Sequence, residues 1–189
     1  MKRQATPPGA VRIIGGSMRG SKLAVPALAG LRPTPQRLRE TLFNWLMPVV
    51  EGARVLDLFA GSGALGIEAM SRGASSALLI ERDRLQAGKI AADLQRLRVA
   101  GAEVRCADAL ECLAGVPAQP YQIVFLDPPF EAGLWSRVAG LLDANGWICA
   151  DTYVYVESPG HVVPDVPARW ALHRETRAGA VRGALYRTG

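Results

Sequence analysis

Residues 55–66 read Val-Leu-Asp-Leu-Phe-Ala-Gly-Ser-Gly-Ala-Leu-Gly, an apolar strand that ends in a glycine-rich turn and opens a helix. In doubly wound α/β folds the ligand lies at the carboxyl ends of the strands, beside the first such turn. Glycines there allow a tight turn and let a ligand approach the backbone closely. We therefore expect a nucleotide-like ligand to contact Phe59, Gly61, Gly63 and Gly66.

The rest of the chain repeats this alternation of short β-rich runs and helical stretches. Strands are expected at residues 54–59, 76–81, 102–106, 121–126 and, in two runs, 146–150 and 153–157, with helices at 64–72, 83–99, 109–114 and 132–144. Because parallel strands need crossover connections, this order predicts an α/β, doubly wound, mostly parallel sheet covered by helices on both faces. Residues 170–177 and 181–187 predict an antiparallel hairpin that closes one edge and completes a seven-stranded sheet.

The N-terminal part has a different texture. Residues 11–25 hold two apolar, β-branched segments around a glycine-rich turn, which is typical of a β-hairpin. We divide the chain into a basic hairpin extension, 1–30, and a main domain, 31–189. A helix follows, with Thr34 as its N-cap, Pro35 at its first position and its end at Pro48. Arg37 and Arg39 lie off its apolar stripe and are expected to face solvent or phosphate.

Length and composition describe an ordinary globular protein. The chain has 189 residues, 49% hydrophobic and 21% charged, which is enough for one domain with one core and one active site. Its apolar runs are short, and the first eight residues lack the apolar core of a signal peptide. These features predict a cytoplasmic protein without a membrane segment, and we expect a monomer.

Three cysteines, Cys106, Cys112 and Cys149, show no Cys-x-x-Cys pairing. An odd number without such spacing predicts neither a disulfide framework nor a zinc site. We expect all three to be small buried apolar residues, and we expect no metal.

The net charge of +5 is unevenly divided along the chain. Residues 1–40 carry eight Lys and Arg against one acid (net +7), residues 41–168 carry nine against fifteen (net −6), and residues 169–189 carry five against one (net +4). Basic ends around an acidic middle indicate that the ends meet a polyanion, although a merely solvated basic surface is an equal alternative. The cations that we expect to contact nucleic acid are Arg12, Arg19, Lys22, Arg32, Arg37 and Arg39.

Acidic residues close three successive strands. Asp57 stands four residues before Gly61, where the carboxylate would repel a pyrophosphate but attract the ammonium and sulfonium of S-adenosylmethionine. Glu81, followed by Arg82, can accept both ribose hydroxyls. Asp108 can accept from the adenine amino group with Ala109 beside it, although a helix N-cap is an equal alternative for Asp108. We therefore expect S-adenosylmethionine as cofactor, with S-adenosylhomocysteine as product.

The string Asp127-Pro128-Pro129-Phe130 follows another apolar strand. The prolines fix the backbone and remove its donors, so the Asp127 carboxylate and the Pro128 carbonyl form an array of acceptors. Two acceptors can take hydrogen bonds from both N–H groups of a nucleobase amino group, so that the lone pair of the nitrogen points towards a methyl donor. Phe130 can stack on the base. This pattern predicts methylation of an exocyclic amino group, while a rigid turn is the alternative.

Together these motifs resemble class I S-adenosylmethionine methyltransferases, with a Rossmann-like fold, and in particular the RsmD family. The resemblance rests on Arg12-Ile-Ile-Gly-Gly-Ser-Met-Arg-Gly-Ser-Lys22, on residues 32–46, on residues 57–69 and on Asp127-Pro-Pro-Phe130, and it covers residues 11–160. It implies methylation of guanine N2 in bacterial 16S ribosomal RNA, with the assembled small subunit as substrate. Related enzymes often carry Asn where this chain has Asp127, which leaves the charge state of Asp127 open.

Three alternatives remain. An adenine-N6 DNA or RNA methyltransferase would use the same Asp127 string, but 189 residues leave no room for a target-recognition domain. An inactive RNA-binding module is disfavoured by the intact acids. An NAD-dependent oxidoreductase is disfavoured by Asp57 and by the lack of hydride-transfer groups near the glycines. His161 and His173 lie outside the motifs and are expected at the surface or a sheet edge.

Overall fold

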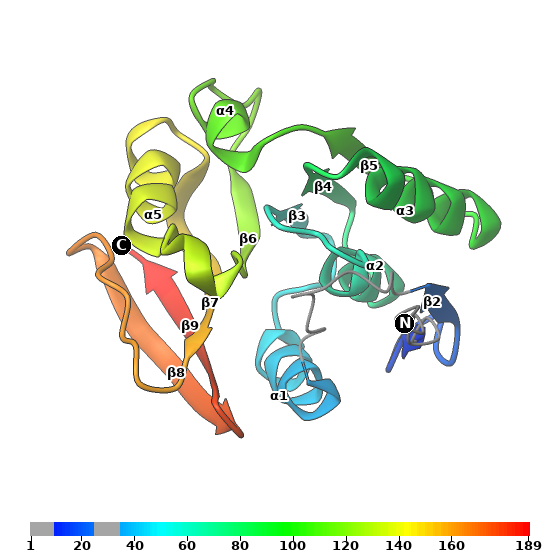
Figure 1. Ribbon diagram of the computed structural model, residues 1–189, viewed down its shortest axis with the longest axis horizontal. Coiled ribbons are helices and arrows are strands. Elements are labelled where there is room, and N and C mark those ends of the chain that lie inside the picture. Colours follow the sequence, from blue (N-terminus) through cyan, green and yellow to red (C-terminus); the bar gives the residue numbers. More distant parts are fainter. Residues whose placement is uncertain (1–9, 25–34) are drawn as a thin grey trace, which may run out of the picture.

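A computed structural model describes residues 10–24 and 35–189 (Figure 1). The proposed N-cap Thr34, the candidate RNA contact Arg32 and the boundary between residues 30 and 31 lie outside the described residues. In the described ranges no helix is long and apolar enough to cross a membrane.

The main sheet has seven strands in the order β5-β4-β3-β6-β7-β9-β8 (Figure 1). Strands β3 to β7 run parallel, and β9 pairs antiparallel with both β7 and β8. The prediction of a doubly wound, mostly parallel sheet closed by a C-terminal hairpin is confirmed. The strands are β3 (Arg54–Asp57), β4 (Ser76–Glu81), β5 (Ala102–Cys106), β6 (Tyr121–Leu126), β7 (Ile148–Pro159), β8 (Trp170–Ala178) and β9 (Val181–Thr188).

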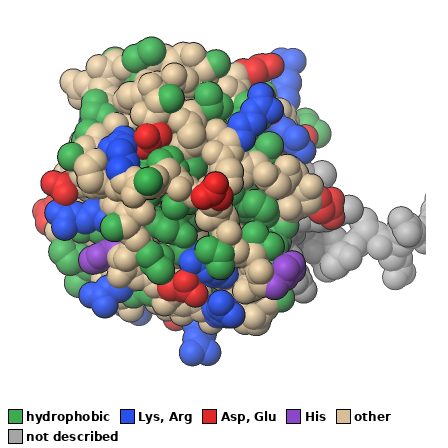
Figure 2. Space-filling view, turned by 90° about the vertical axis from the view of Figure 1, so that its left-hand side faces the viewer, with side chains coloured by type: hydrophobic (Ala, Val, Ile, Leu, Met, Phe, Trp, Pro, Cys, Tyr) green, Lys and Arg blue, Asp and Glu red, His purple; other side chains and the backbone are tan. Residues whose placement is uncertain are grey.

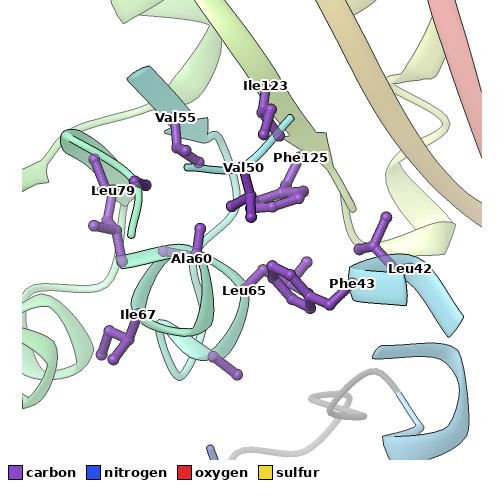
Figure 3. Close-up of a cluster of buried hydrophobic side chains, with 14 of the residues drawn as sticks. Leu42, Phe43, Val50, Val55, Ala60, Leu65, Ile67, Leu79, Ile123 and Phe125 are labelled. Carbon is purple, nitrogen blue, oxygen red and sulfur yellow. The ribbon is translucent and has the colours of Figure 1, made fainter. Parts of the chain in front are cut away.

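Helices cover both faces of this sheet. They are α1 (Gln36–Leu46), α2 (Ala64–Ser71), α3 (Arg84–Arg96), α4 (Ala109–Leu113) and α5 (Trp135–Ala144), with a 3₁₀ turn η1 (Phe130–Ala132). One core lies between the sheet and α1, α2 and α3, where Phe43 and Leu65 meet Phe125 from β6 (Figure 3). The second core lies under α4 and α5. Helix α1 begins one residue later than expected, because Pro35 is its N-cap.

The N-terminal hairpin is confirmed as β1 (Ala10–Arg12) paired antiparallel with β2 (Lys22–Ala24). It forms a separate two-stranded sheet. Its apolar side chains Val11, Ile13 and Leu23 are buried in the same core as α1 and α2. The extension is therefore packed onto the main fold through an apolar inner side.

Strand β7 is continuous across the two runs expected from the sequence. Between the pairs Tyr121↔Ile148 and Ile123↔Tyr153 the register shifts, so β7 bulges against β6. The Thr152 hydroxyl closes the bulge by donating to the Tyr121 carbonyl over 2.8 Å and accepting from the Cys149 amide over 3.1 Å. Polar residues in the bulge explain why the sequence looked interrupted.

The expectation of three buried cysteines is wrong. Cys106 is exposed, and Cys112 and Cys149 are half-buried. Cys106 ends β5, which pairs with β4 and is one of the two edge strands of the seven-stranded sheet. An edge strand is covered less completely than a central one, which explains this exposure. His161 and His173 are exposed, as expected.

Candidate active site

The proposed site residues come together at one edge of the sheet. Asp57 ends β3 and Glu81 ends β4, while Asp127 follows β6 directly and Asp108 comes two residues after the end of β5. These four strands are parallel, so their carboxyl ends share one edge. The spacing of acids in the sequence thus becomes a row of carboxylates in space.

The glycine-rich turn after β3 is fixed by its neighbours. The Ala60 amide donates to the Ile80 carbonyl over 3.0 Å, which ties the turn to β4. Gly63 has a φ of +74° and is the N-cap of α2, a conformation that side chains other than glycine rarely adopt. A Cβ on Gly66 would lie 2.8 Å from the Leu79 side chain, so this glycine lets α2 lie close against β4.

Asp57 is a buried carboxyl group, only 3% exposed. Its Oδ2 accepts from the Gly66 amide over 3.0 Å. Burial raises the pKa of Asp57 to about 7 against the opposing Gly66 hydrogen bond, and the charges of Asp127 and Glu81 add to the rise. Negative charge is therefore costly here, and a cation bound beside these acids would relieve that cost.

Glu81 braces the same turn. Its Oε2 accepts from the Gly61 amide over 2.9 Å, and its Oε1 accepts from the Asp83 amide over 2.8 Å. Arg82 is exposed beside it. The carboxylate therefore connects the glycine turn to the start of α3. Its contact with a ribose stays a prediction.

Asp108 is the N-cap of α4, the alternative that the sequence left open. Its Oδ1 accepts from the Leu110 amide over 2.8 Å and the Glu111 amide over 3.3 Å. Ala109 next to it is buried. A contact between Asp108 and adenine stays a prediction.

The Asp127-Pro-Pro-Phe string forms a short, shaped loop between β6 and α5. Asp127 is half-buried, Pro128 is buried and Pro129 is the N-cap of η1. Phe130 is 37% exposed, and its ring centroid lies 6.1 Å from that of Trp135. An exposed aromatic ring beside a carboxylate can receive a planar base carrying an amino group.

Sequence reasoning missed a second layer behind Asp127. The Tyr155 hydroxyl donates to Glu157 Oε2 over 3.1 Å, and both residues are buried on β7, next to β6. The pKa of Tyr155 is raised well above its usual value by burial and by the charges of Glu157 and Asp127. Trp135 Nε1 donates to the Glu157 carbonyl over 2.7 Å. The sequence feature that could have indicated this pair is Glu157, because it is an acid near the end of a strand, like Asp57 and Glu81.

Five of the six candidate RNA contacts lie within the described residues, four of them exposed and one, Arg39, buried. Arg12, Arg19, Lys22 and Arg37 are exposed, and these four residues form what we name the N-terminal basic surface. Their contact with RNA stays a prediction.

The expectation that Arg39 faces solvent or phosphate is wrong. Its side chain is 3% exposed, and its Nη1 donates to the Arg12 carbonyl over 3.0 Å. The pKa of Arg39 is lowered by burial, against the opposing charges of Glu68 and Glu40. The N-terminal hairpin packs against this side of α1 and covers Arg39.

Comparisons with known proteins agree with this architecture. Residues 11–187 match the family described as conserved hypothetical protein 95. The chain is 50% identical over 179 residues to ribosomal RNA small subunit methyltransferase D of Escherichia coli, covering 94% of this chain and 90% of the relative. The enzyme of the same name from Haemophilus influenzae is 42% identical over 191 residues, covering 98% and 99%.

Solved structures give the same result. A methyltransferase structure from Escherichia coli superimposes with a TM-score of 0.88 at 48% identity, covering 95% of this chain and 98% of that one. An RNA methyltransferase from Salinibacter ruber, at 21% identity and a TM-score of 0.63, shares the fold. The matched family model, the identities and the acids at the sheet edge lead to one conclusion: this chain belongs to the RsmD family of methyltransferases.

Proposed function

We propose that this protein transfers a methyl group from S-adenosylmethionine to the exocyclic N2 amino group of a guanine in 16S ribosomal RNA. The proposed substrate is the assembled small subunit, and the protein acts as a monomer in the cytoplasm. Relatives named ribosomal RNA small subunit methyltransferase D support the substrate class. The observation that carries the chemistry is the exposed Phe130 ring beside Asp127, at the same sheet edge as Asp57 and Glu81.

The residues at the sheet edge suit this cofactor. Asp57 lies where a cation lowers the cost of its charge, which fits the amino-acid ammonium of the cofactor. Glu81 is half-buried and fits the ribose hydroxyls, while Asp108 and Ala109 fit the adenine side. Phe59, Gly61 and the rest of the turn would lie against the cofactor. When bound, S-adenosylmethionine supplies the electrophilic methyl group.

The chain's own residues orient the acceptor. In this mechanism the two N–H groups of the guanine amino group donate hydrogen bonds to the Asp127 carboxylate and the Pro128 carbonyl, so that the nitrogen lone pair faces the methyl donor. Phe130 stacks on the base, a contact commonly worth about 1–3 kcal/mol. Positioning supplies most of the acceleration. Asp127 then takes the proton that the amino group loses.

The test is incubation with labelled S-adenosylmethionine and, separately, assembled small subunits, naked 16S RNA and duplex DNA, followed by nucleoside analysis. Labelled N2-methylguanosine from small subunits is the expected result. Labelled N6-methyladenosine would replace the proposal with the adenine alternative. Absence of label from every substrate, with wild-type protein that binds the cofactor in calorimetry, would overturn it.

A further inference from the structure

A group of hydrogen bonds outside the active site holds the N-terminal hairpin on α2. Glu68 of α2 is fully buried, with 0% of its surface exposed. Its Oε2 accepts from the Ile14 amide over 2.7 Å, and its Oε1 accepts from the Gly15 amide over 2.8 Å. Arg72 Nε donates to the same Oε1 over 2.8 Å. A buried carboxylate is thus satisfied largely by the backbone of the hairpin connection.

Ser71, one helical turn further on α2, adds contacts to the same connection. Its hydroxyl donates to the Gly15 carbonyl over 2.6 Å and accepts from the Met18 amide over 2.9 Å. Its carbonyl accepts from the Ser17 amide over 2.8 Å. A Cβ on Gly16, whose φ is +74°, would overlap the Ser71 carbonyl oxygen. The connection therefore lies directly on α2, with no space between them.

Two further helices hold the strands of the hairpin. Arg39 of α1 donates to the Arg12 carbonyl over 3.0 Å, and Arg96 of α3 donates to the Lys22 carbonyl over 2.7 Å. Three helices of the main fold thus fix the backbone of an extension whose strands are only three residues long. Such a short hairpin has little stability of its own.

The outer side of the hairpin is cationic. Arg12, Arg19 and Lys22 are exposed, and residues 10–24 contain no acid. None of the three forms an ion pair with another described residue. Helix α2 begins at the glycine-rich turn and carries Glu68 about one helical turn further on, about 6 Å along the axis. One short helix therefore connects the proposed cofactor turn to the cationic hairpin.

We propose that Glu68 is a positioning residue that sets the cationic hairpin at a fixed place relative to the cofactor turn, and through it the capture of the RNA substrate. This proposal rests on the proposed function. Removing one partner of a buried charged group is costly, because the other partners stay buried without a match. A glutamine in place of Glu68 keeps the shape but can accept through only one oxygen, so the two hairpin amides can no longer both be held.

The test compares Glu68→Gln with wild type in four measurements. We expect faster hydrogen exchange at the Ile14 and Gly15 amides by NMR, and a KM for small subunits raised by about tenfold. Because the hairpin is not assigned to the reacting atoms, kcat and the Kd of S-adenosylmethionine are expected to stay within about twofold. Glu103→Gln, a change at an exposed carboxylate on β5, is the matched control and is expected to leave all four values unchanged.

A second variant and a double-mutant cycle provide independent checks of the proposal. If Glu68→Gln fails to fold, Ser71→Ala removes two of the hairpin contacts and is expected to raise KM in the same way. Arg19→Gln is expected to weaken capture in the wild type but much less in the Glu68→Gln background, since both act through the hairpin.

The outcomes separate the two proposals. Faster amide exchange with an unchanged KM would overturn the positioning role, and so would equal losses in kcat, KM and cofactor binding, which indicate general loosening. If wild-type protein methylates no RNA, the proposed function fails. In that case unchanged exchange at Ile14 and Gly15 in Glu68→Gln would independently overturn the role of Glu68 in holding the hairpin.

Discussion

The two hairpins at the ends of this chain have similar net charge but use their cations differently. In and beside the C-terminal hairpin β8–β9, four of five arginines are paired with acids: Arg169 with Asp143 at 2.6 Å, Arg177 and Arg182 with Glu175 at 3.7 and 2.6 Å, and Arg187 with Asp151 at 2.7 Å. Arg174 forms no ion pair with another described residue. Figure 2 shows the side of the molecule that carries β8, where basic and acidic side chains are interspersed. The N-terminal hairpin has no acid of its own. Net charge along a sequence therefore does not show which cations already face acids, whereas the ion pairs in the structure do.

The largest expected effect is the loss of turnover on changing Asp127, which lies outside both hairpins. It is the reference against which the effects of the two hairpins are compared. In Asp127→Ala, kcat is expected to fall by about a hundredfold or more, because the carboxylate is assigned to the target amino group. Binding of small subunits and of S-adenosylmethionine is expected to stay within about twofold. Single-turnover kinetics and filter binding measure the two properties. Capture that fell as far as turnover would show that binding cannot report on the hairpins separately.

The most direct comparison removes two cations from each end. Arg19→Gln with Arg37→Gln is expected to weaken RNA capture by about twentyfold and to lower the log–log salt slope by about 0.7–0.9 per lost contact. Arg177→Gln with Arg187→Gln is expected to change capture by less than about twofold, because both arginines already face acids. Filter binding over a salt series gives both values. Equal losses of RNA capture at the two ends would contradict the proposed difference between the paired and the unpaired cations.

A pH series separates hairpin charge from site charge. Arginine and lysine stay charged from pH 5 to 9, so the affinity for RNA should not change over this range, apart from any change that follows from cofactor binding. The raised pKa of Asp57, about 7, means that the carboxylate ionises across neutral pH, and cofactor affinity is expected to rise by about tenfold from pH 6 to pH 8. Calorimetry measures this rise, and Asp57→Asn should abolish it.

The same shift has an opposite sign for stability. The folded state holds the Asp57 proton more tightly than the unfolded chain, in which the pKa of this carboxyl group is near its ordinary value of 3.8. Unfolding free energy should therefore fall as pH rises from about 4 to about 7, and stay constant for this group above that range. In Asp57→Asn this contribution should disappear from denaturant titrations.

The smallest expected effect tests whether the C-terminal charges serve the fold. Arg182 is buried and pairs with Glu175, so Glu175→Ala is expected to lower the free energy of unfolding by about 1 kcal/mol, a modest value because Glu175 is partly exposed. Arg177→Gln, at the exposed end of the same cluster, should cost less than about 0.5 kcal/mol. Urea titrations measure the free energy of unfolding of both variants. A large loss of RNA capture without loss of stability in Glu175→Ala would contradict this assignment.

Local patterns in the sequence predicted the central sheet and the acids that lie at its carboxyl end. Strands such as 121–126 are nearly continuous apolar runs, as expected for parallel strands buried on both faces. The cap made by Asp108 involves amides two and three residues away, so it was available as a local alternative. The N-terminal hairpin followed from its glycine-rich turn.

What the sequence could not provide depends on residues far apart in the chain. Arg39 is buried because the hairpin reaches it from Arg12, 27 residues earlier. Tyr155 and Glu157 stand behind Asp127 because β7 pairs with β6 past a bulge, and periodicity alone cannot locate such a register shift. A Cβ on Gly183 would lie 2.6 Å from the Tyr155 hydroxyl, so this pair also depends on a glycine two strands later.

The attachment of the hairpin to α2 also orders events during synthesis of the chain. The hairpin is made first, yet the Glu68 and Ser71 atoms that hold it come 53 to 56 residues later. A two-stranded hairpin with strands of three residues is marginal in water. The nascent extension therefore has to wait for α2, and it becomes ordered only when the first βαβ unit of the main sheet has begun to assemble.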